Sequence, residues 1–157
     1  MARVAIDTNI LAYAEGVNLR PTDQPKVAAS RRLMNALIDA DDASLVIPVQ
    51  ALAELYRVLT GKGGWRGEDA RAAVDALAAV AEARPTNEGV LSEGLQLATR
   101  HGFQIFDALI MAAAVEARCD LLLSEDMQDG FSWRGVVVSN PFGPAPDARI
   151  SRLLAAS

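Results

Sequence analysis

The sequence predicts an α/β protein: a three-layer α/β/α sandwich with a central, mostly parallel sheet. Four short apolar runs indicate strands, at residues 4–6, 44–47, 121–123 and 136–138. Stretches with helical periodicity separate the first three, whereas the last follows only a short loop. Strands that are apolar throughout are covered on both faces, and helical crossovers imply parallel pairing. A chain of 157 residues, 51% of them hydrophobic, is long enough for one domain with a substantial core.

The stretches between the strands carry the signals of helices and turns. The predicted helices cover residues 8–14, 26–40, 48–60, 68–84, 88–101 and 108–119, with a short one at 148–155 in the tail. Asn87 is expected to cap the fifth helix, which ends before Gly102, and Asp107 stands at the N-terminus of the sixth. The glycine-rich stretch 61–67 is expected to be a flexible linker.

Composition excludes some classes of function. The formal net charge of −5 argues against attraction of nucleic acid to the whole surface. It leaves room for a nuclease, whose site must be acidic to hold metal. No run of about 18 apolar residues is present, so we expect no membrane span. Cys119 is the only cysteine, which fits a reducing cytoplasm.

Four acids can be placed at one edge of the predicted sheet. Asp7 directly follows the first strand, and Asp126 follows the third by three residues. Glu54 lies about two turns into the helix after the second strand, and Asp107 begins a helix. Strand ends and the helices that follow them share the carboxyl edge, where ligands bind in open α/β sheets. The alternatives are an N-cap role for Asp7 and a helix-surface role for Glu54.

Clustered carboxylates point to a metal ion. They repel one another and raise each other's pKa unless a cation is present. Their hard oxygen atoms suit Mg²⁺ or Mn²⁺, which support phosphodiester hydrolysis in one- and two-metal sites. The sequence has no Cys or His cluster with zinc spacing and no Gly-Lys-Ser/Thr phosphate loop. The single histidine, His101, falls near a helix C-terminus, where we expect it to be solvated.

These motifs, in this order, resemble those of PIN-domain ribonucleases, and particularly of VapC-type toxins from bacterial toxin–antitoxin pairs. The matching residues are 5–11 (Ala-Ile-Asp-Thr-Asn-Ile-Leu), 53–55 (Ala-Glu-Leu), 107–110 (Asp-Ala-Leu-Ile), 123–130 (Leu-Ser-Glu-Asp-Met-Gln-Asp-Gly) and 140–142 (Asn-Pro-Phe). The resemblance reaches Phe142, which implies a PIN-like nuclease domain at residues 1–143. Residues 144–157 form a tail outside it.

The resemblance implies a Mg²⁺-dependent endoribonuclease, with Mn²⁺ as the other candidate ion. Carried over by position, the catalytic acids are Asp7, Glu54, Asp107 and Asp126. The metal ligands are Asp7, Asp107, Asp126 and, optionally, Asp129, whose alternative is an Asp-Gly turn. Thr8, Asn9 and Ser124 match polar residues that line the family's site, where they orient water or carboxylates, or cap helices. Glu125 is expected to be solvated.

RNA and protein partners follow from the same resemblance. Local positive charge is available in a loop with Lys62, Trp65 and Arg66, where Trp65 could stack on a base. A second basic region contains Arg20, Lys26, Arg31 and Arg32. A small antitoxin would lie in a groove and cover the acidic site with a basic side chain. Apolar residues expected either to line that groove or to belong to the core are Leu33, Leu37, Tyr56 and Leu59. The resemblance also implies a homodimer.

Two other classes of function compete with the nuclease. A haloacid-dehalogenase-like phosphatase or a receiver domain also uses an aspartate at a strand end, here Asp7. The phosphatase pattern needs a second Asp where this chain has Asn9, and a receiver needs a lysine after a late strand, whereas the only lysines are Lys26 and Lys62. The other alternative is a PIN-fold module that binds RNA or protein without cleaving.

Overall fold

The computed structural model describes all 157 residues, which form one six-stranded sheet and seven α-helices. The strands are β1 (Ala2–Ile6), β2 (Ala43–Pro48), β3 (Glu82–Arg84), β4 (Leu121–Leu123), β5 (Ser132–Trp133) and β6 (Val136–Ser139). The helices are α1 (Thr8–Ala14), α2 (Gln24–Asp39), α3 (Val49–Thr60), α4 (Gly67–Val80), α5 (Glu88–His101), α6 (Ile105–Glu116) and α7 (Ala148–Ala156), with a 3₁₀ turn η1 (Pro21–Asp23) before α2.

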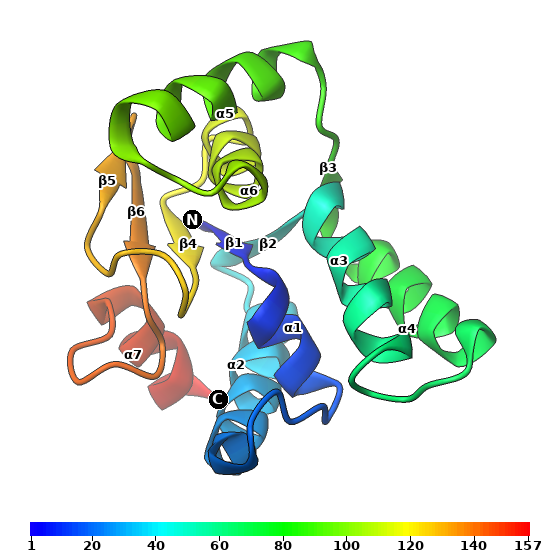
Figure 1. The fold of residues 1–157 in the computed structure, drawn as a ribbon. Coiled ribbons are helices and arrows are strands. Elements are labelled where there is room, and N and C mark those ends of the chain that lie inside the picture. Colours follow the sequence, from blue (N-terminus) through cyan, green and yellow to red (C-terminus); the bar gives the residue numbers. More distant parts are fainter.

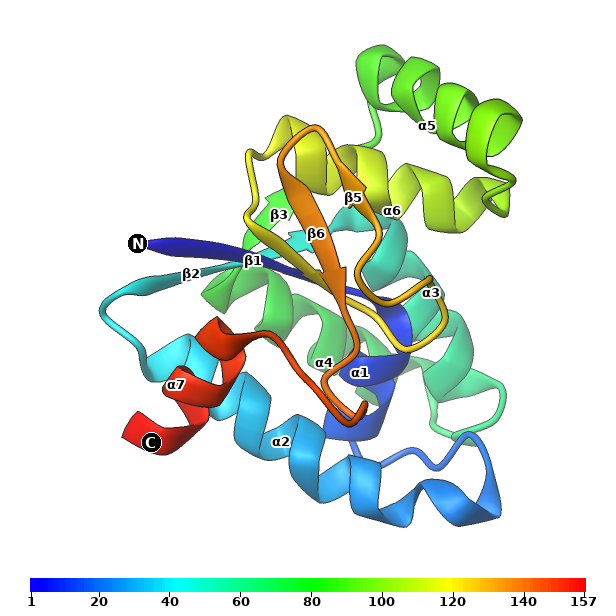
Figure 2. The same cartoon turned by 90° about the vertical axis from the view of Figure 1, so that its left-hand side faces the viewer.

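The sheet runs in the order β3-β2-β1-β4-β6-β5, and all neighbours are parallel except β5 and β6. Helices α5 and α6 cover one face, and α1, α2 and α7 lie against the other (Figures 1 and 2). The α3–α4 hairpin extends from the β2–β3 side of the sheet (Figure 1). The predicted sandwich with a mostly parallel sheet is therefore confirmed.

The three central strands form the middle of the core. Val4 pairs with Leu45 on one side and Leu121 on the other, and all three side chains are buried. Strands covered on both faces gain by being apolar throughout, because each buried side chain contributes about 1.5–3 kcal/mol. This is why the central strands were predictable from their apolar runs.

Two strands at the edges of the sheet escaped prediction. Residues 82–84 were assigned to the end of a long helix, but α4 stops at Val80 and the chain pairs with β2 instead. Strand β5 pairs only with β6. Edge strands are short and polar, which protects their unpaired backbone groups from other chains. They therefore lack the apolar pattern that indicates a strand.

Two other local predictions need correction. Helix α6 begins at Ile105 rather than Ala108, because the Gln104 side chain accepts hydrogen bonds from the backbone N–H groups of Phe106 and Asp107. The stretch expected to be a flexible linker is a turn closed by backbone hydrogen bonds, such as that from Trp65 N to Leu59 O at 2.9 Å. A Cβ at Gly63 would lie 2.5 Å from the Leu59 carbonyl oxygen, so the turn requires glycine there.

Other predictions hold. Asn87 caps α5, and Gly102, in the left-handed conformation, ends it. The tail helix forms as α7 and packs on α2, burying Ile150. No helix is long and apolar enough to cross a membrane. The proposed groove residues Leu33, Leu37 and Leu59 are buried in the core, so only Tyr56 of that set is exposed.

Candidate metal centre

The four predicted catalytic acids and their polar neighbours lie around the carboxyl edge of the sheet, near the ends of β1 and β4. The connection from β1 to β2 runs through α1 and α2 on one face of the sheet. The connection from β3 to β4 runs through α5 and α6 on the opposite face. The edge between β1 and β4 is therefore a topological switch point, the usual position of ligand sites in open α/β sheets. The backbone N–H of Asp7 donates to the Leu123 carbonyl oxygen at 2.9 Å, which joins the two strand ends directly. In Figure 1 the junction lies where β1 runs into α1, and Figure 2 shows both termini on the other side of the molecule.

Asp7 is the most buried acid of the site. Its carboxylate caps α1 by accepting from Thr8 N at 2.7 Å, and its second oxygen accepts from Ser124 Oγ at 2.7 Å. Burial raises its pKa from 3.8 to about 7; these two hydrogen bonds oppose the rise, and the charges of Asp107 and Asp126 add to it. Asp7 is thus both a helix cap and a member of the acidic site, the two roles that the sequence left open.

Thr8 and Ser124 orient two of the carboxylates. Ser124 Oγ accepts from the backbone N–H groups of Asp126 and Met127 at 3.2 Å, so its own proton points to Asp7. Thr8 Oγ1 donates to Glu54 Oε2 at 2.7 Å, and Gln50 holds the other oxygen at 3.2 Å.

Asn9 links Asp126 to a residue that was expected to be solvated. Its amide nitrogen donates to Asp126 Oδ2 at 2.7 Å and to Glu125 Oε1 at 3.2 Å. The side chain of Glu125 is only 11% exposed, and it also accepts from Tyr13 and pairs with Lys26. The prediction for Glu125 is therefore wrong. No local pattern reveals this, because Lys26 is 99 positions away in the sequence.

Asp107 completes the acidic group from the N-terminus of α6. It is half-buried, and no protein group donates a hydrogen bond to its carboxylate. Burial, followed by the charges of Asp126 and Glu54, raises its pKa. Burial and the Glu125 carboxylate raise the pKa of Asp126, against the effect of Arg20 and Lys26. These mutual influences show that the acids lie within electrostatic reach of one another.

The oxygen ligands available in the site suit a hard divalent cation, although they are not already arranged around one position. Carboxylate oxygens are the ligands preferred by Mg²⁺ and Mn²⁺, and the oxygens of Asp107 have no other partner. In this conformation no three acidic side chains are arranged to hold one ion together. Asp107 is half-buried and Asp126 is exposed. Of the two carboxylates, only that of Asp126 is held by a protein donor, the Asn9 amide.

The remaining predicted site residues lie further out. Asp129 accepts from the backbone N–H of Asn140 at 2.9 Å, and so ties together the loops that follow β4 and β6. In the α3–α4 turn, Lys62 and Arg66 are exposed, whereas Trp65 is half-buried against the core. Arg66 lies 3.5 Å from Glu68, a solvent-exposed pair.

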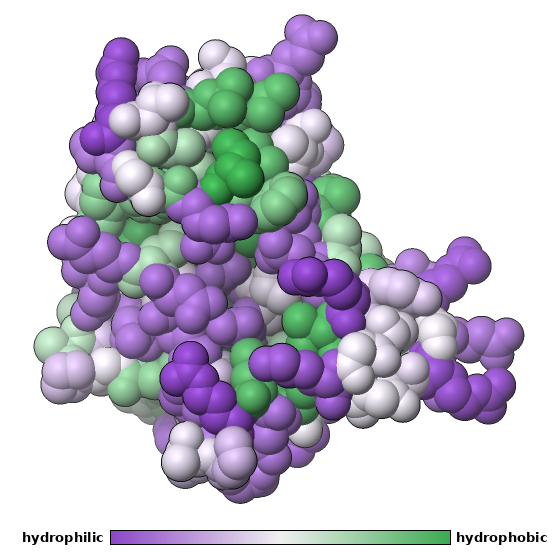
Figure 3. Space-filling view, viewed as in Figure 1, coloured by the Kyte–Doolittle hydropathy of each residue, from purple (hydrophilic) through white to green (hydrophobic).

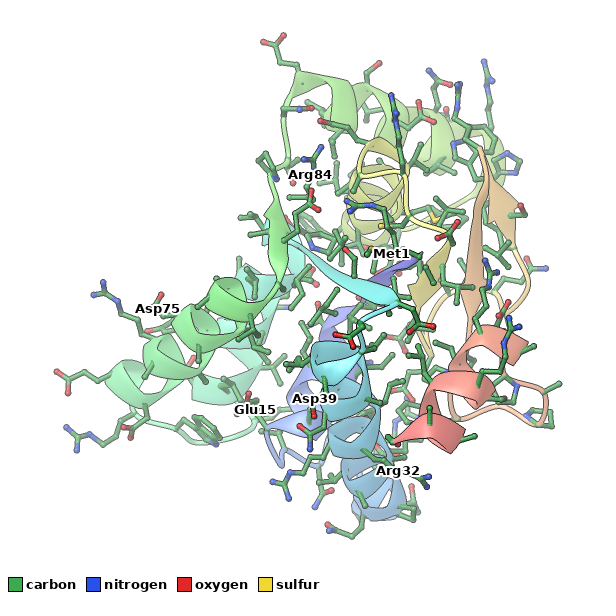
Figure 4. All side chains as sticks on the ribbon, turned by 180° about the vertical axis from the view of Figure 1, so that it is seen from behind. Met1, Glu15, Arg32, Asp39, Asp75 and Arg84 are labelled. Atoms are coloured by element: carbon green, nitrogen blue, oxygen red, sulfur yellow. The ribbon has the colours of Figure 1, made fainter.

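Of the second basic region, only part faces the site. Arg20 and Lys26 act on Asp126, but Arg32 donates to the Leu154 carbonyl and lies beside α7, as seen from behind in Figure 4. Arg31 donates to the Ala14 carbonyl oxygen. The exposed His101 has its ring edge against Phe131 and Trp133, away from the acids.

Fold and site together define an α/β protein with an acidic, oxygen-lined centre at the switch point of its sheet. The sequence model of the PIN domain family matches residues 4–131 of this chain. The chain therefore belongs to the PIN domain family. The sheet order agrees, since a receiver domain places β3 rather than β4 beside β1.

Solved structures from toxin–antitoxin systems share the fold. VapC20 of Mycobacterium tuberculosis, a toxin that cleaves the sarcin–ricin loop, has a TM-score of 0.60 at 16% identity, over 76% of this chain and 86% of that one. VapBC2 of Rickettsia felis, bound to a promoter DNA fragment, has a TM-score of 0.62 at 17% identity, over 88% of this chain and 98% of that one. A toxin–antitoxin complex from Klebsiella pneumoniae has a TM-score of 0.62 at 16% identity, over 88% of this chain and 98% of that one. No curated protein sequence matches this chain.

Proposed function

We propose that the protein is a Mg²⁺-dependent endoribonuclease that acts in the cytoplasm as the toxin of a toxin–antitoxin pair, with Mn²⁺ as a substitute ion. The observation that carries the proposal is the meeting of Asp7, Glu54, Asp107 and Asp126 at one edge of a PIN-domain sheet. Three of these acids have raised pKa values, mainly because of burial and in part because of neighbouring carboxylates, and a bound cation would offset both effects.

The residues would divide the work as follows. Asp7, Asp107 and Asp126 hold the ion, Asp129 is an optional outer ligand, and Glu54 orients the attacking water. A bound divalent ion supplies electrostatic stabilisation of the charge that develops on the phosphate. Thr8, Asn9 and Ser124 fix the carboxylates, so that little reorganisation accompanies the reaction.

The test of the activity is cleavage of RNA by the purified protein. We expect endonucleolytic products in the presence of millimolar Mg²⁺ and none after the metal is removed by a chelator. A protein that binds RNA and leaves it intact with Mg²⁺ and Mn²⁺ would favour the non-cleaving module.

A partner would cover the acidic site. The solved complexes from Rickettsia felis and Klebsiella pneumoniae contain toxin–antitoxin pairs, and we propose a small antitoxin for this chain too. Figure 3 shows hydrophobic groups gathered over α5 and α6, above a hydrophilic centre. The large exposed apolar side chains of these two helices are Leu91, Leu95 and Phe106, and Phe106 is next to Asp107 in the chain. An apolar segment ending in a basic residue suits this surface. We also propose a homodimer, which sedimentation of the purified chain would check.

The α3–α4 turn is proposed to hold the RNA backbone. Replacing Lys62 and Arg66 together by alanine is expected to weaken RNA binding roughly tenfold and to lower the salt slope by about 2, one for each lost phosphate contact. Arg32→Ala is the matched control, because it removes a charge next to α7 on the far side (Figure 4). Filter binding across a salt series measures both quantities. An unchanged affinity would remove the turn from the binding surface.

A further inference from the structure

The acidic site is backed by a group of buried and half-buried polar side chains, of which only Asn9 has a part in the proposed function. It joins three segments: Asn9 and Tyr13 of α1, Lys26 at the start of α2, and Glu125 after β4. Tyr13 is 1% exposed, and its hydroxyl donates to Glu125 Oε1 at 2.5 Å. Lys26 Nζ lies 2.7 Å from Glu125 Oε2.

Both oxygen atoms of Glu125 already accept hydrogen bonds from protein donors. Oε1 accepts from Tyr13 and Asn9, and Oε2 accepts from Lys26. Burial and the carboxylates of Glu125 and Asp23 raise the pKa of Tyr13, so the hydroxyl keeps its proton and remains a donor. Every partner of Glu125 is thus a donor that fixes its position.

Asn9 connects Glu125 to Asp126, so the fixed position of Glu125 also restricts where the Asp126 carboxylate can lie. Its one amide nitrogen donates to both Glu125 Oε1 and Asp126 Oδ2. Asn9 and Tyr13 are one helical turn apart, so both reach Glu125 from the same side of α1. Lys26 is held in turn by Asp23 at 3.2 Å and lies 5.6 Å and 5.5 Å from the ring centres of Tyr13 and Phe142.

Burying an ion pair is costly, and replacing such pairs by apolar residues often leaves stability unchanged or higher. The Lys26–Glu125 pair is partly buried, with side chains 28% and 11% exposed, so part of this cost applies to it. Stability alone therefore gives little reason for such a pair one residue from a candidate metal ligand. We infer that Glu125, held by Lys26 and Tyr13, is a positioning residue that sets the direction of Asp126 toward the metal through Asn9. This inference rests on the proposed metal site.

The test is Mn²⁺ binding to the full chain without RNA, followed by electron paramagnetic resonance. Glu125→Gln keeps the size of the side chain but turns an amide toward Lys26, and Lys26→Met removes the other half of the pair. Loss of an outer partner of a metal ligand costs about 10- to 100-fold in affinity, so we expect the dissociation constant for Mn²⁺ to rise by that factor in both variants. Cleavage should recover at saturating Mn²⁺, since the ligands themselves are intact.

Glu82→Gln is the matched control. It breaks the 2.6 Å pair between Arg3 and Glu82, which lies toward the amino end of β1, about 13 Å along the strand from Asp7. We expect its Mn²⁺ affinity to stay within about twofold of the unmodified protein, a difference below 0.5 kcal/mol. Thermal unfolding of every variant shows whether the fold is retained. Should one site variant fail to fold, the other decides the question.

The outcomes separate the inference from the proposed function. Mn²⁺ binding that is unchanged in Glu125→Gln, or weakened equally in Glu82→Gln, overturns the positioning role. An unmodified protein that binds no Mn²⁺ overturns both. An unmodified protein that binds Mn²⁺ but cleaves no RNA overturns the nuclease alone, and the comparison of the variants still decides the role of Glu125.

Discussion

Asp107→Asn is expected to lower RNA cleavage at least about 100-fold, because it weakens the hold on the ion that would stabilise the charge developing on the phosphate. The substitution keeps the shape of the side chain and removes its charge. No hydrogen bond within the protein ends on the Asp107 carboxylate, so the fold loses nothing. Initial rates on a labelled RNA at saturating Mg²⁺ measure the loss.

Asp75→Asn is the control for this experiment. Asp75 projects from the outer side of α4, where it forms an exposed pair with Arg71 (Figure 4). Its variant should cleave RNA like the unmodified protein. If Asp107→Asn also cleaves at the unmodified rate, Asp107 has no part in the reaction and the assignment of the acids fails.

The second large effect is on stability without metal. Between pH 5.5 and pH 8, in the presence of a chelator, the free energy of unfolding is expected to fall by about 2 kcal/mol, or about 4–8 °C in Tm. The main cause is Asp7, whose pKa is about 7 in the folded protein against an ordinary 3.8. The raised pKa values of Asp107 and Asp126 act in the same direction.

The sign follows from proton binding. Between pH 3.8 and pH 7 the folded protein keeps a proton on Asp7 that the unfolded chain has already lost. The folded state binds more protons there, so stability decreases as pH rises and levels off above pH 7. Asp7→Asn carries no such proton and should flatten the curve.

Scanning calorimetry at both pH values checks this expectation. Millimolar Mg²⁺ should restore the stability at pH 8 in the unmodified protein, because a ligand that binds only the folded state stabilises it. Asp7→Asn should lose most of the pH dependence, leaving the part due to Asp107 and Asp126, and should lose the response to Mg²⁺. An unmodified protein that is more stable at pH 8 than at pH 5.5 in chelator would show that burial does not hold the proton on Asp7.

The central strands and the acids were open to prediction for a shared physical reason. A strand covered on both faces must be apolar, and an acid directly after it must lie at the carboxyl edge. Asp7 and Asp126 could therefore be placed from their positions after β1 and β4, and Asp107 from its place at the start of a helix. Glu54 needed the family resemblance, since an acid within a helix is as often a surface residue, and Ser124 was assigned to the site only by that resemblance.

What the sequence did not reveal depends on contacts between distant segments. The direction of Glu125 is set by Lys26 and Tyr13, which no local pattern brings near it. Leu33 and Leu37 were left open between a groove and the core, and the structure places both in the core, on the helix that packs against β2. An amphipathic pattern shows which face of a helix is apolar, and only the structure shows what already covers that face.

The short polar strand β3 was also missed because its place in the sheet depends on a contact with a distant segment. Glu82 in β3 is held by Arg3 of β1 across the intervening strand β2, at 2.6 Å. This contact makes a polar segment part of the sheet. Its local sequence, Glu-Ala-Arg after an alanine-rich helix, is equally compatible with one more helical turn.

The most direct measurement of the central claim is a crystal structure of the protein soaked in Mn²⁺, with anomalous scattering at the manganese edge. The account predicts an anomalous peak at the β1–β4 switch point, about 2.1 Å from oxygen atoms of Asp7, Asp107 and Asp126. The carboxylate of Asp107, which accepts no hydrogen bond within the protein, should be the one that turns toward the ion. Manganese bound only elsewhere on the surface would contradict the proposed site.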